Sequence, residues 1–475
     1  MHLTTFCGSL AGLLCAALLS GCQNVRTDPS ACTFSHAGMC AGHWREVGPG
    51  YRLSYIDIGN SGLVADPRQL EAAVSAIEDT SKTAPTLSVI FVHGWFHSDA
   101  TSDRDVNRAR AMLQFFRSQQ PSWKIEGIYV GWHAYTWLPE PLSFLTFEVK
   151  KRAAERVAHL GLTETILRVE AATRRNPRNK LLIVGHSFGG LAVLEATSPI
   201  FLSRLIEARG DLESGHSHPV QGVGDLVVLL NPAVEASQII PLLEESNEAT
   251  AATIRSGQGN RLTGIFAEND RPLLLSLTSK TDDAVGKAFP IGTFLDRHGQ
   301  QDIMIARPQR ADPSLLRVSE EKLTNHTVGK TSEITTHQID ADGSIGPGGP
   351  KAFHYAAIGK PSGDLLPEGW LRCSIHLYTQ THPQAAQDGM QYDFLTLPFS
   401  YIDIREMPDS VSAFNPYWNA TVDRDVMNHH SEFMNQNLAR FIWQILFSPQ
   451  SINHDDAKKC TEEGSATATA PNLGI

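Results

Sequence analysis

An apolar run, followed at once by a glycine-rich turn and a helical pattern, places the tightest constraint on how this chain folds. The run is Leu181–Val184, the turn is Gly185-His-Ser-Phe-Gly-Gly190, and apolar residues at helical spacing follow to about Glu207. A bare Gly-x-Ser-x-Gly pattern arises by chance on the order of 0.2 times in a chain of this length. A strand before the pattern and a helix after it are typical of a strained turn that exposes its serine. We therefore predict that Ser187 stands on such a turn.

Short β-branched runs alternate with longer helical patterns along most of the chain. This alternation predicts an α/β fold, a mostly parallel sheet with helices on both faces. The expected strands are Tyr51–Ile58, Leu87–Val92, Ile125–Val130, Leu181–Val184, Leu226–Leu230, Leu273–Leu277 and Tyr417–Val422. The expected helices are about Asp103–Ser118, Leu145–Arg175, Gly190–Glu207 and Glu432–Phe447.

The stretch from about 289 to 415 differs from the rest, with scattered Gly, Pro and His and weak periodicity. It is too long for a loop without secondary structure of its own. We expect a long insertion at one edge of the sheet, before the last strand.

Charge limits the partners of the chain. The net charge is −11, from 51 acidic and 40 basic residues, which argues against nucleic acid as a partner. An acidic body is also repelled by anionic lipid headgroups, so attachment to a membrane needs another means. Composition therefore indicates a large globular protein and leaves its oligomeric state open.

The N-terminal segment predicts such a means of attachment. Residues 1–21 carry no charged side chain, and Leu10–Leu19 is almost wholly apolar, which fits a signal peptide better than a spanning helix of about 20 apolar residues. Leu19-Ser-Gly-Cys22 resembles the lipobox of bacterial lipoproteins, which implies cleavage before Cys22 and lipidation of that cysteine. Gln23 after the cysteine implies the outer membrane of the cell envelope if the source is Gram-negative, on its periplasmic or surface side. A buried N-terminal hairpin is the alternative.

The remaining cysteines are predicted to be structural. Cys32, Cys40, Cys373 and Cys460 are an even set in an oxidising compartment, and none has metal-ligand spacing. Cys32–Cys40 closes a short loop and is the favoured disulfide, while Cys373–Cys460 would pin the C-terminal tail. We expect no metal at these residues.

A serine nucleophile needs a base, and the base needs an orienting carboxylate. On this type of fold they follow in the order serine, acid, histidine. Asp282 and Asp283 come directly after the expected next-to-last strand, and His429 and His430 come after the last strand. Position alone leaves both pairs open.

An oxyanion hole is also required, because stabilising the tetrahedral intermediate is often the largest catalytic contribution. One donor is expected to be the backbone N–H of Phe188, the residue after the nucleophile. The second is expected to be the backbone N–H of Trp95, since His93-Gly94-Trp95 follows an early strand and the glycine lets the backbone approach the substrate. His93 itself is predicted to be a buried hydrogen-bonding residue in preference to a base.

Taken together, these motifs resemble lipase/esterase-like α/β-hydrolases, and more narrowly a largely uncharacterised group of bacterial and fungal hydrolases. The stretches that carry the resemblance are Val89–His97, Asp105–Asn107, Ile128–Trp132, Pro141–Phe147, Gly185–Gly190, Ser279–Asp282, Ala284, Ala288–Pro290, Thr327–Gly329, Thr336–His337 and Met427–Glu432. The resemblance implies an α/β-hydrolase fold, and it selects Asp282 over Asp283 and His430 over His429.

The activity that the resemblance implies is hydrolysis of a small-molecule or lipid carboxylic ester through an acyl-enzyme, with Ser187, Asp282 and His430 as the catalytic residues. No metal or organic cofactor is expected. The same triad serves thioesterases, acyltransferases and peptidases, and a non-catalytic envelope lipoprotein that uses the fold for binding is a further alternative.

The expected organisation has one large domain. Residues 1–21 are the signal peptide, 22–44 the lipidated cysteine and a tether, 45–450 the α/β-hydrolase domain with its insertion, and 451–475 a flexible tail.

Overall fold

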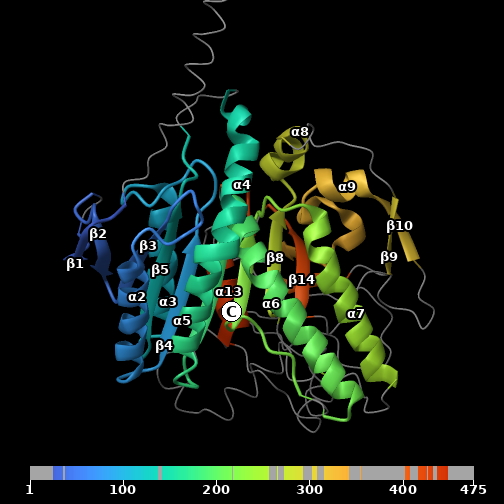
Figure 1. The fold of residues 1–475 in the computed structure, drawn as a ribbon, viewed down its shortest axis with the longest axis horizontal. Helices are drawn as coiled ribbons and strands as arrows, with labels where there is room; N and C mark the ends of the chain where they lie inside the picture. The colour runs from blue at the N-terminus through green and yellow to red at the C-terminus, as the bar shows by residue number, and fades with distance from the viewer. Residues whose placement is uncertain are drawn as a thin grey trace, which may run out of the picture.

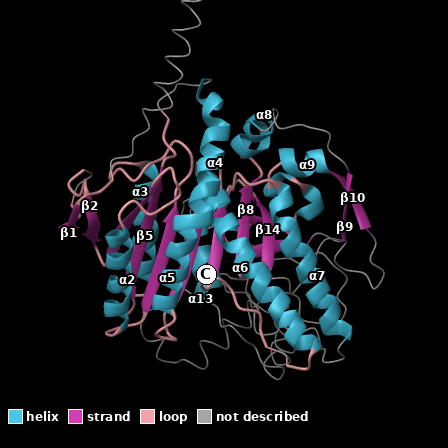
Figure 2. Ribbon diagram, viewed as in Figure 1, coloured by secondary structure: helices cyan, strands magenta, loops and turns pink. Residues whose placement is uncertain are grey.

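The fold is an α/β fold built on one mostly parallel sheet with helices around it (Figures 1 and 2). It is seen in a computed structural model that describes residues 25–35, 38–136, 142–216, 218–255, 265, 272–292, 302–306, 315–341, 353–354, 402–406, 416–424, 426–431 and 436–447. The strand order in the main sheet is β1-β2-β3-β5-β4-β6-β7-β8-β14-β11-β12-β13. A separate hairpin, β9–β10, stands at one side of the molecule in Figure 2.

The strands that run parallel to one another are β3, β5, β4, β6, β7, β8, β14 and β11, whereas β2 pairs antiparallel with β3. The strand bounds are β1 (Asp28–Thr33), β2 (His43–Gly48), β3 (Tyr51–Ile58), β4 (Thr86–Val92), β5 (Lys124–Trp132), β6 (Lys180–His186), β7 (Leu226–Leu230), β8 (Leu274–Ser279), β9 (Asp302–Ala306), β10 (Leu315–Ser319), β11 (His337–Ala341), β12 (Phe353–His354), β13 (Ile402–Glu406) and β14 (Tyr417–Val422). Because the central strands are parallel, their carboxyl ends lie together at one end of the strands, where α/β folds bind ligands.

The helices cover both faces of the sheet. Their bounds are α2 (Pro67–Ser81), α3 (Arg104–Gln119), α4 (Phe147–Val157), α5 (Thr163–Thr173), α6 (Phe188–Glu213), α7 (Ile240–Arg255), α8 (Phe289–Gly292), α9 (Glu320–Asn325) and α13 (Gln436–Phe447). In Figure 1, α5, α6 and α7 lie in front of the strands and α13 lies behind them.

Each face of the sheet has its own apolar core. One core joins buried side chains of α2, α4, α5, α6 and α7 to the strands, including Leu70, Ile166 and Leu191. The other joins α3 and α13 to the opposite face, with Phe116 and Trp443 among its fully buried side chains. Alternate residues of one strand enter different cores, since side chains of a strand point to opposite faces: Ile90 lies in the first core and Phe91 in the second.

All seven expected strands are present, each within two residues of its expected ends. The expected helix Leu145–Arg175 is a continuous run of α4, a π-helical turn at Ala158–Leu162, and α5. The expected helix Gly190–Glu207 is longer, because α6 begins directly after Ser187 and reaches Glu213. Part of the last expected helix, residues 432–435, lies outside the described residues. Helices α2 and α7 and strands β1 and β2 were not anticipated.

Part of the expected insertion adds strands at one edge of the sheet, while Val328 and Gly329 contact Asn419 of β14 and Thr278 of β8, which are internal strands. Strand β11 pairs parallel with β14, and β12 and β13 follow it antiparallel. The last strand in the sequence, β14, is therefore internal to the sheet. The rest of the insertion lies outside the described residues.

The disulfide between Cys32 and Cys40 is present, with a sulfur–sulfur distance of 2.08 Å, which confirms the favoured pairing. Part of the expected tether is folded, because Arg26 is buried and donates a hydrogen bond from its backbone N–H to Asp57. The expected signal peptide, Cys22, Cys373, Cys460 and the expected tail 451–475 lie outside the described residues.

Among the described helices, α6 alone is long and apolar enough to cross a membrane by length and composition. More than half of its most apolar stretch is buried inside the protein, as in a core helix.

Candidate active site

Ser187 stands on a sharp turn between β6 and α6. Its backbone has φ +56° and ψ −121°, a conformation that residues with a side chain seldom adopt. The turn is held by hydrogen bonds from the backbone N–H of Ser187 to the carbonyl of Leu230, at 3.1 Å, and from that of Ala233 to the carbonyl of Ser187, at 3.1 Å. A Cβ on Gly189 would lie 2.2 Å from the backbone oxygen of Val92, so glycine is required where the turn doubles back. This geometry places the hydroxyl of Ser187 at the carboxyl ends of the parallel strands.

The three side chains expected to form a triad are connected by two consecutive hydrogen-bond contacts. The hydroxyl of Ser187 is 2.9 Å from Nε2 of His430, and Nδ1 of His430 is 2.7 Å from Oδ2 of Asp282. Asp282 is fully buried, while the His430 side chain retains 22% of its exposure. The carboxylate can orient the imidazole, which in turn can take the proton of the hydroxyl.

Asp283 and His429, the alternative acid and base in the sequence, do not take part in these two contacts. Asp283 is exposed to solvent, whereas Asp282 also accepts a hydrogen bond from the backbone N–H of Val285 at 3.1 Å. The ring of His429 is exposed and lies 3.4 Å from the carbonyl oxygen of Thr281. The geometry therefore brings Asp282 and His430 to Ser187, and leaves Asp283 and His429 outside these contacts.

Asn231, which the sequence analysis did not single out, connects the loops that carry the acid and the base. Its amide nitrogen donates to the carbonyl oxygens of His429 and His430, at 2.9 and 3.0 Å. Its side-chain oxygen accepts the backbone N–H of Ser279, where β8 ends. Asn231 is fully buried, with φ +45°. A polar residue directly after the apolar strand β7 is the signal that could have found it.

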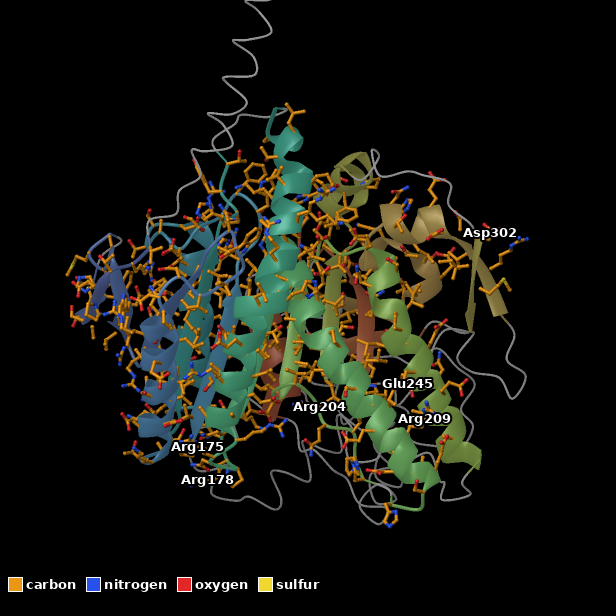
Figure 3. The ribbon with its side chains drawn as sticks, viewed as in Figure 1. Arg175, Arg178, Arg204, Arg209, Glu245 and Asp302 are labelled. Carbon is orange, nitrogen blue, oxygen red and sulfur yellow. A yellow bond between two sulfur atoms is a disulfide. The ribbon has the colours of Figure 1, made fainter. Side chains whose placement is uncertain are left out.

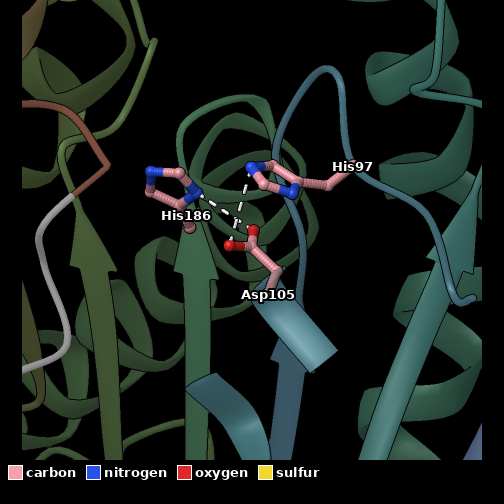
Figure 4. Close-up of side chains that lie close together, drawn as sticks. All are labelled: His97, Asp105 and His186. Carbon is pink, nitrogen blue, oxygen red and sulfur yellow. Dashed lines mark hydrogen bonds and ion pairs between the residues drawn. The ribbon is translucent and has the colours of Figure 1, made fainter. Parts of the chain in front are cut away.

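A polar network lies on the other side of the base and was also not anticipated (Figure 4). Nε2 of His186 lies 3.1 Å from the carbonyl oxygen of His430, and its Nδ1 lies 3.2 Å from Oδ2 of Asp105. Figure 4 shows the rings of His97 and His186 beside each other above the Asp105 carboxylate, with Nε2 of His97 3.6 Å from Oδ1. Arg108 binds the same Oδ1 at 2.6 Å. His186 thus joins the turn of the serine to the loop of the base.

The electrostatics of this network are set by burial and charge together. Burial favours the neutral ring and lowers the pKa of His186 to about 4, against the opposing effect of the Asp105 carboxylate. Burial alone would raise the pKa of Asp105, but His186, His97 and Arg108 hold it below its ordinary value. Asp105 is therefore an ionised carboxylate that accepts a hydrogen bond from Arg108 and contacts the rings of His186 and His97.

The loop after β4 lies directly against the nucleophile. A Cβ on Gly94 would lie 2.8 Å from Cβ of Ser187, so only glycine allows this close approach. His93 is buried: its Nε2 accepts the backbone N–H of Trp132 at 3.2 Å, and burial lowers its pKa. These contacts agree with a structural role for His93. Trp95 follows Gly94, and its ring centroid lies 5.8 Å from that of Phe188.

A cavity of about 510 Å³ opens over Ser187. It contains both residues expected to supply the oxyanion hole, together with aromatic, small apolar and charged side chains. Its lining is Trp95, Phe96, His97, Ser102, Asp103, Arg104, Arg108, Phe147, His186, Ser187, Phe188, Ala233, Ala284, Val285, Phe289, His430 and Ser431. Ser187 and His430 therefore face a space large enough for a small organic molecule.

No protein-family model matches the chain, and no curated protein matches its sequence. Among solved structures, phospholipase PlaB from Legionella pneumophila, in complex with thio-NAD, matches with 14% sequence identity and a TM-score of 0.24. The match covers 80% of this chain and 62% of that one, so the chain spans about three fifths of the length of that phospholipase. The geometry of the site therefore carries the evidence for function.

Proposed function

We propose that this chain is a serine hydrolase of the lipase/esterase-like α/β-hydrolase group, which cleaves carboxylic esters through an acyl-enzyme. The observation that carries the proposal is the position of His430, which lies within hydrogen-bond distance of both Ser187 and Asp282. Each contact joins segments far apart in the sequence, and each has the orientation that its role requires.

In the proposed acylation step, Oγ of Ser187 attacks the ester carbonyl carbon and its proton passes to Nε2 of His430. Asp282 accepts the Nδ1–H of the resulting imidazolium and stabilises its charge. When the tetrahedral intermediate collapses, the carbon–oxygen bond to the alcohol breaks and His430 returns the proton to the leaving oxygen. A water molecule then attacks the acyl-enzyme with His430 as base, which releases the carboxylic acid and restores Ser187.

The oxyanion of each intermediate is assigned to the backbone N–H groups of Phe188 and Trp95. Phe188 begins α6, so its N–H is one of the N-terminal groups of a helix that need a partner outside the helix. The close approach of Gly94 to Ser187 supports Trp95 as the second donor. Such donors contribute about 10²- to 10³-fold each to the rate.

Attachment to the cell envelope through lipidated Cys22 is part of the proposal, and the sequence Leu19-Ser-Gly-Cys22 supports it. The full chain expressed in a Gram-negative bacterium should enter the membrane fraction, and Cys22→Ser should move it to the soluble fraction. An unprocessed or soluble wild-type chain contradicts the anchor without affecting the proposed chemistry.

Hydrolysis of short p-nitrophenyl esters tests the activity. We expect turnover of p-nitrophenyl acetate and butyrate by the wild-type chain and a loss of about 10³-fold or more in Ser187→Ala. Matched thioester and anilide substrates separate an esterase from a thioesterase or a peptidase. Absence of turnover above the Ser187→Ala background on every substrate overturns the proposal.

A further inference from the structure

The cavity over Ser187 has two chemically different sides. One side is aromatic: the ring centroids of Phe147 lie 5.2 Å from Phe188, 5.6 Å from Phe289 and 5.9 Å from Trp95. Phe96 stacks on Trp95 at 4.3 Å. Rings in continuous contact form an apolar surface next to the two residues assigned to the oxyanion hole.

The other side carries two arginines, in a chain with a net charge of −11. Arg104 and Arg108 both line it, from the first turn of α3. The guanidinium of Arg108 is fixed by its contact with Asp105. Arg104 is exposed to solvent, and none of the described residues holds its guanidinium in a hydrogen bond or ion pair.

The acidic residue that lines this cavity among the described residues is Asp103, and its oxygens are directed to other groups. They accept from Nδ1 of His97 at 2.9 Å and from the backbone N–H groups of Asp105 and Ser98, at 2.8 and 3.0 Å. Asp105, the second carboxylate nearby, is fully buried and does not line the cavity. Two guanidinium groups therefore face the cavity: that of Arg108 is paired with buried Asp105, and that of Arg104 is held by none of the described residues.

We propose that Arg104 and Arg108 bind a phosphate group on the alcohol part of the ester substrate, while the acyl chain lies among the aromatic rings. This inference rests on the proposed function and names the substrate class: an acyl ester of a phosphorylated alcohol, hydrolysed to a carboxylic acid and the phosphorylated alcohol. A guanidinium matches the oxygens of a phosphate, and charge-assisted hydrogen bonds are stronger where water is partly excluded.

Two short-chain esters that differ in the phosphate alone provide the test, 1-butyrylglycerol and 1-butyrylglycerol 3-phosphate. The butyryl chain keeps both substrates monomeric in solution. We expect kcat/KM of the wild-type chain to be at least about tenfold higher for the phosphorylated ester, the size of one charge-assisted interaction. If the two kcat/KM values differ by less than about twofold, the inference is overturned, because one charge-assisted hydrogen bond should produce a larger difference.

Variants of the exposed arginine identify the source of the preference. In Arg104→Gln the ratio should fall about tenfold, and Arg104→Lys should retain more of it because the charge remains. Arg178→Gln is the matched control: Arg178 is exposed, lies near the start of β6 beside Arg175 in Figure 3, and is removed from the cavity at the other end of that strand. Melting temperatures confirm that all variants are folded. A ratio unchanged in folded Arg104→Gln contradicts the assignment.

Inhibition separates a substrate subsite from a site for free anions. Butyl phosphate should compete with p-nitrophenyl acetate in the wild-type chain at concentrations where butanol and inorganic phosphate do not, and this competition should weaken in Arg104→Gln. Equal inhibition by inorganic phosphate contradicts the proposal, as does no inhibition by butyl phosphate. If p-nitrophenyl acetate is not hydrolysed at all, the proposed function fails first, so the two failures are distinguishable.

Discussion

The backbone carbonyl oxygen of His430 lies 3.1 Å from Nε2 of His186, the residue that precedes Ser187 in the sequence. The residue next to the nucleophile therefore holds the loop of the base as well as the turn of the serine. On its other side His186 contacts the buried carboxylate of Asp105, which fixes the ring. Asn231 donates to the same carbonyl of His430, so this oxygen is held from two directions. Side chains that orient a catalytic group in this way are common supports of hydrolase sites.

Replacement of His186 by Phe should lower kcat about 10- to 100-fold and leave KM within about threefold, because the variant loses the polar ring that lies between the carbonyl oxygen of His430 and the carboxylate of Asp105. The loss of a partner of buried Asp105 should also reduce the free energy of unfolding by about 1–3 kcal/mol. Steady-state kinetics and urea unfolding measure the two effects. His186→Gln, which restores a donor, should recover part of kcat, and His216→Phe at an exposed position is the control. An unchanged kcat in folded His186→Phe rules out the positioning role.

The adjacent aspartates make a matched pair. Asp282→Asn removes the carboxylate that orients His430 and should lower kcat by about 10³- to 10⁴-fold. Asp283→Asn makes the same chemical change at an exposed position and should stay within about twofold of the wild-type chain. Hydrolysis of p-nitrophenyl acetate by the two variants at one pH decides the assignment. Equal losses, or the larger loss in Asp283→Asn, mean that Asp282 is not the triad acid.

Glu195 on α6 predicts a pH dependence of stability. Burial, and the nearby charges of Glu155 and Glu235, raise its pKa to about 7. The folded chain therefore keeps this proton up to about pH 7, whereas the unfolded chain releases it near the ordinary glutamate pKa of about 4.3. Between these values the folded state binds more protons, so stability falls as pH rises.

A variant without the Glu195 carboxyl group should not lose stability in this way as the pH rises. Glu195→Gln should be more stable than the wild-type chain at pH 8, by up to about 3 kcal/mol, with the difference vanishing near pH 4. Glu207→Gln, at an exposed position on the same helix, should show no such dependence. Chemical unfolding across this pH range provides the measurement. A wild-type advantage at pH 8 means that Glu195 is ionised and paired in the folded state.

The sequence predicted best the elements whose burial follows from their own side chains. The strands Tyr51–Ile58, Leu226–Leu230 and Tyr417–Val422 are found with their expected ends, because aromatic, β-branched and leucine residues that favour strands are concentrated in each of them. Strand β2 could not be found in this way. It contains Glu46, which is buried through two hydrogen bonds of 2.7 Å from Arg110, 64 residues away. The pairing of Glu46 with Arg110 depends on the folded structure, so the periodicity of the local sequence does not reveal it.

The residues of the site also differ in whether their own sequence neighbourhood reveals them. Ser187 has a local signature. Strand order narrows the acid to Asp282 or Asp283 and the base to His429 or His430, and the family resemblance implies Asp282 and His430. The contact of His186 with Asp105 joins residues 81 apart, and those of Asn231 with His429 and His430 span nearly 200 residues. A polar residue after an apolar strand marks Asn231, but local sequence does not show these contacts, because they depend on which loops meet at the carboxyl ends of the strands.

Covalent labelling of Ser187 tests the central claim most directly. The wild-type chain, treated with a fluorophosphonate probe and digested, should carry one label on the peptide that contains Ser187, identified by mass spectrometry. Ser187→Ala should carry none, and His430→Ala should react at least about 10²-fold more slowly, because the serine lacks its base. His429→Ala should react at nearly the wild-type rate. An unlabelled wild-type chain, or a label on another residue that persists in Ser187→Ala, contradicts the account.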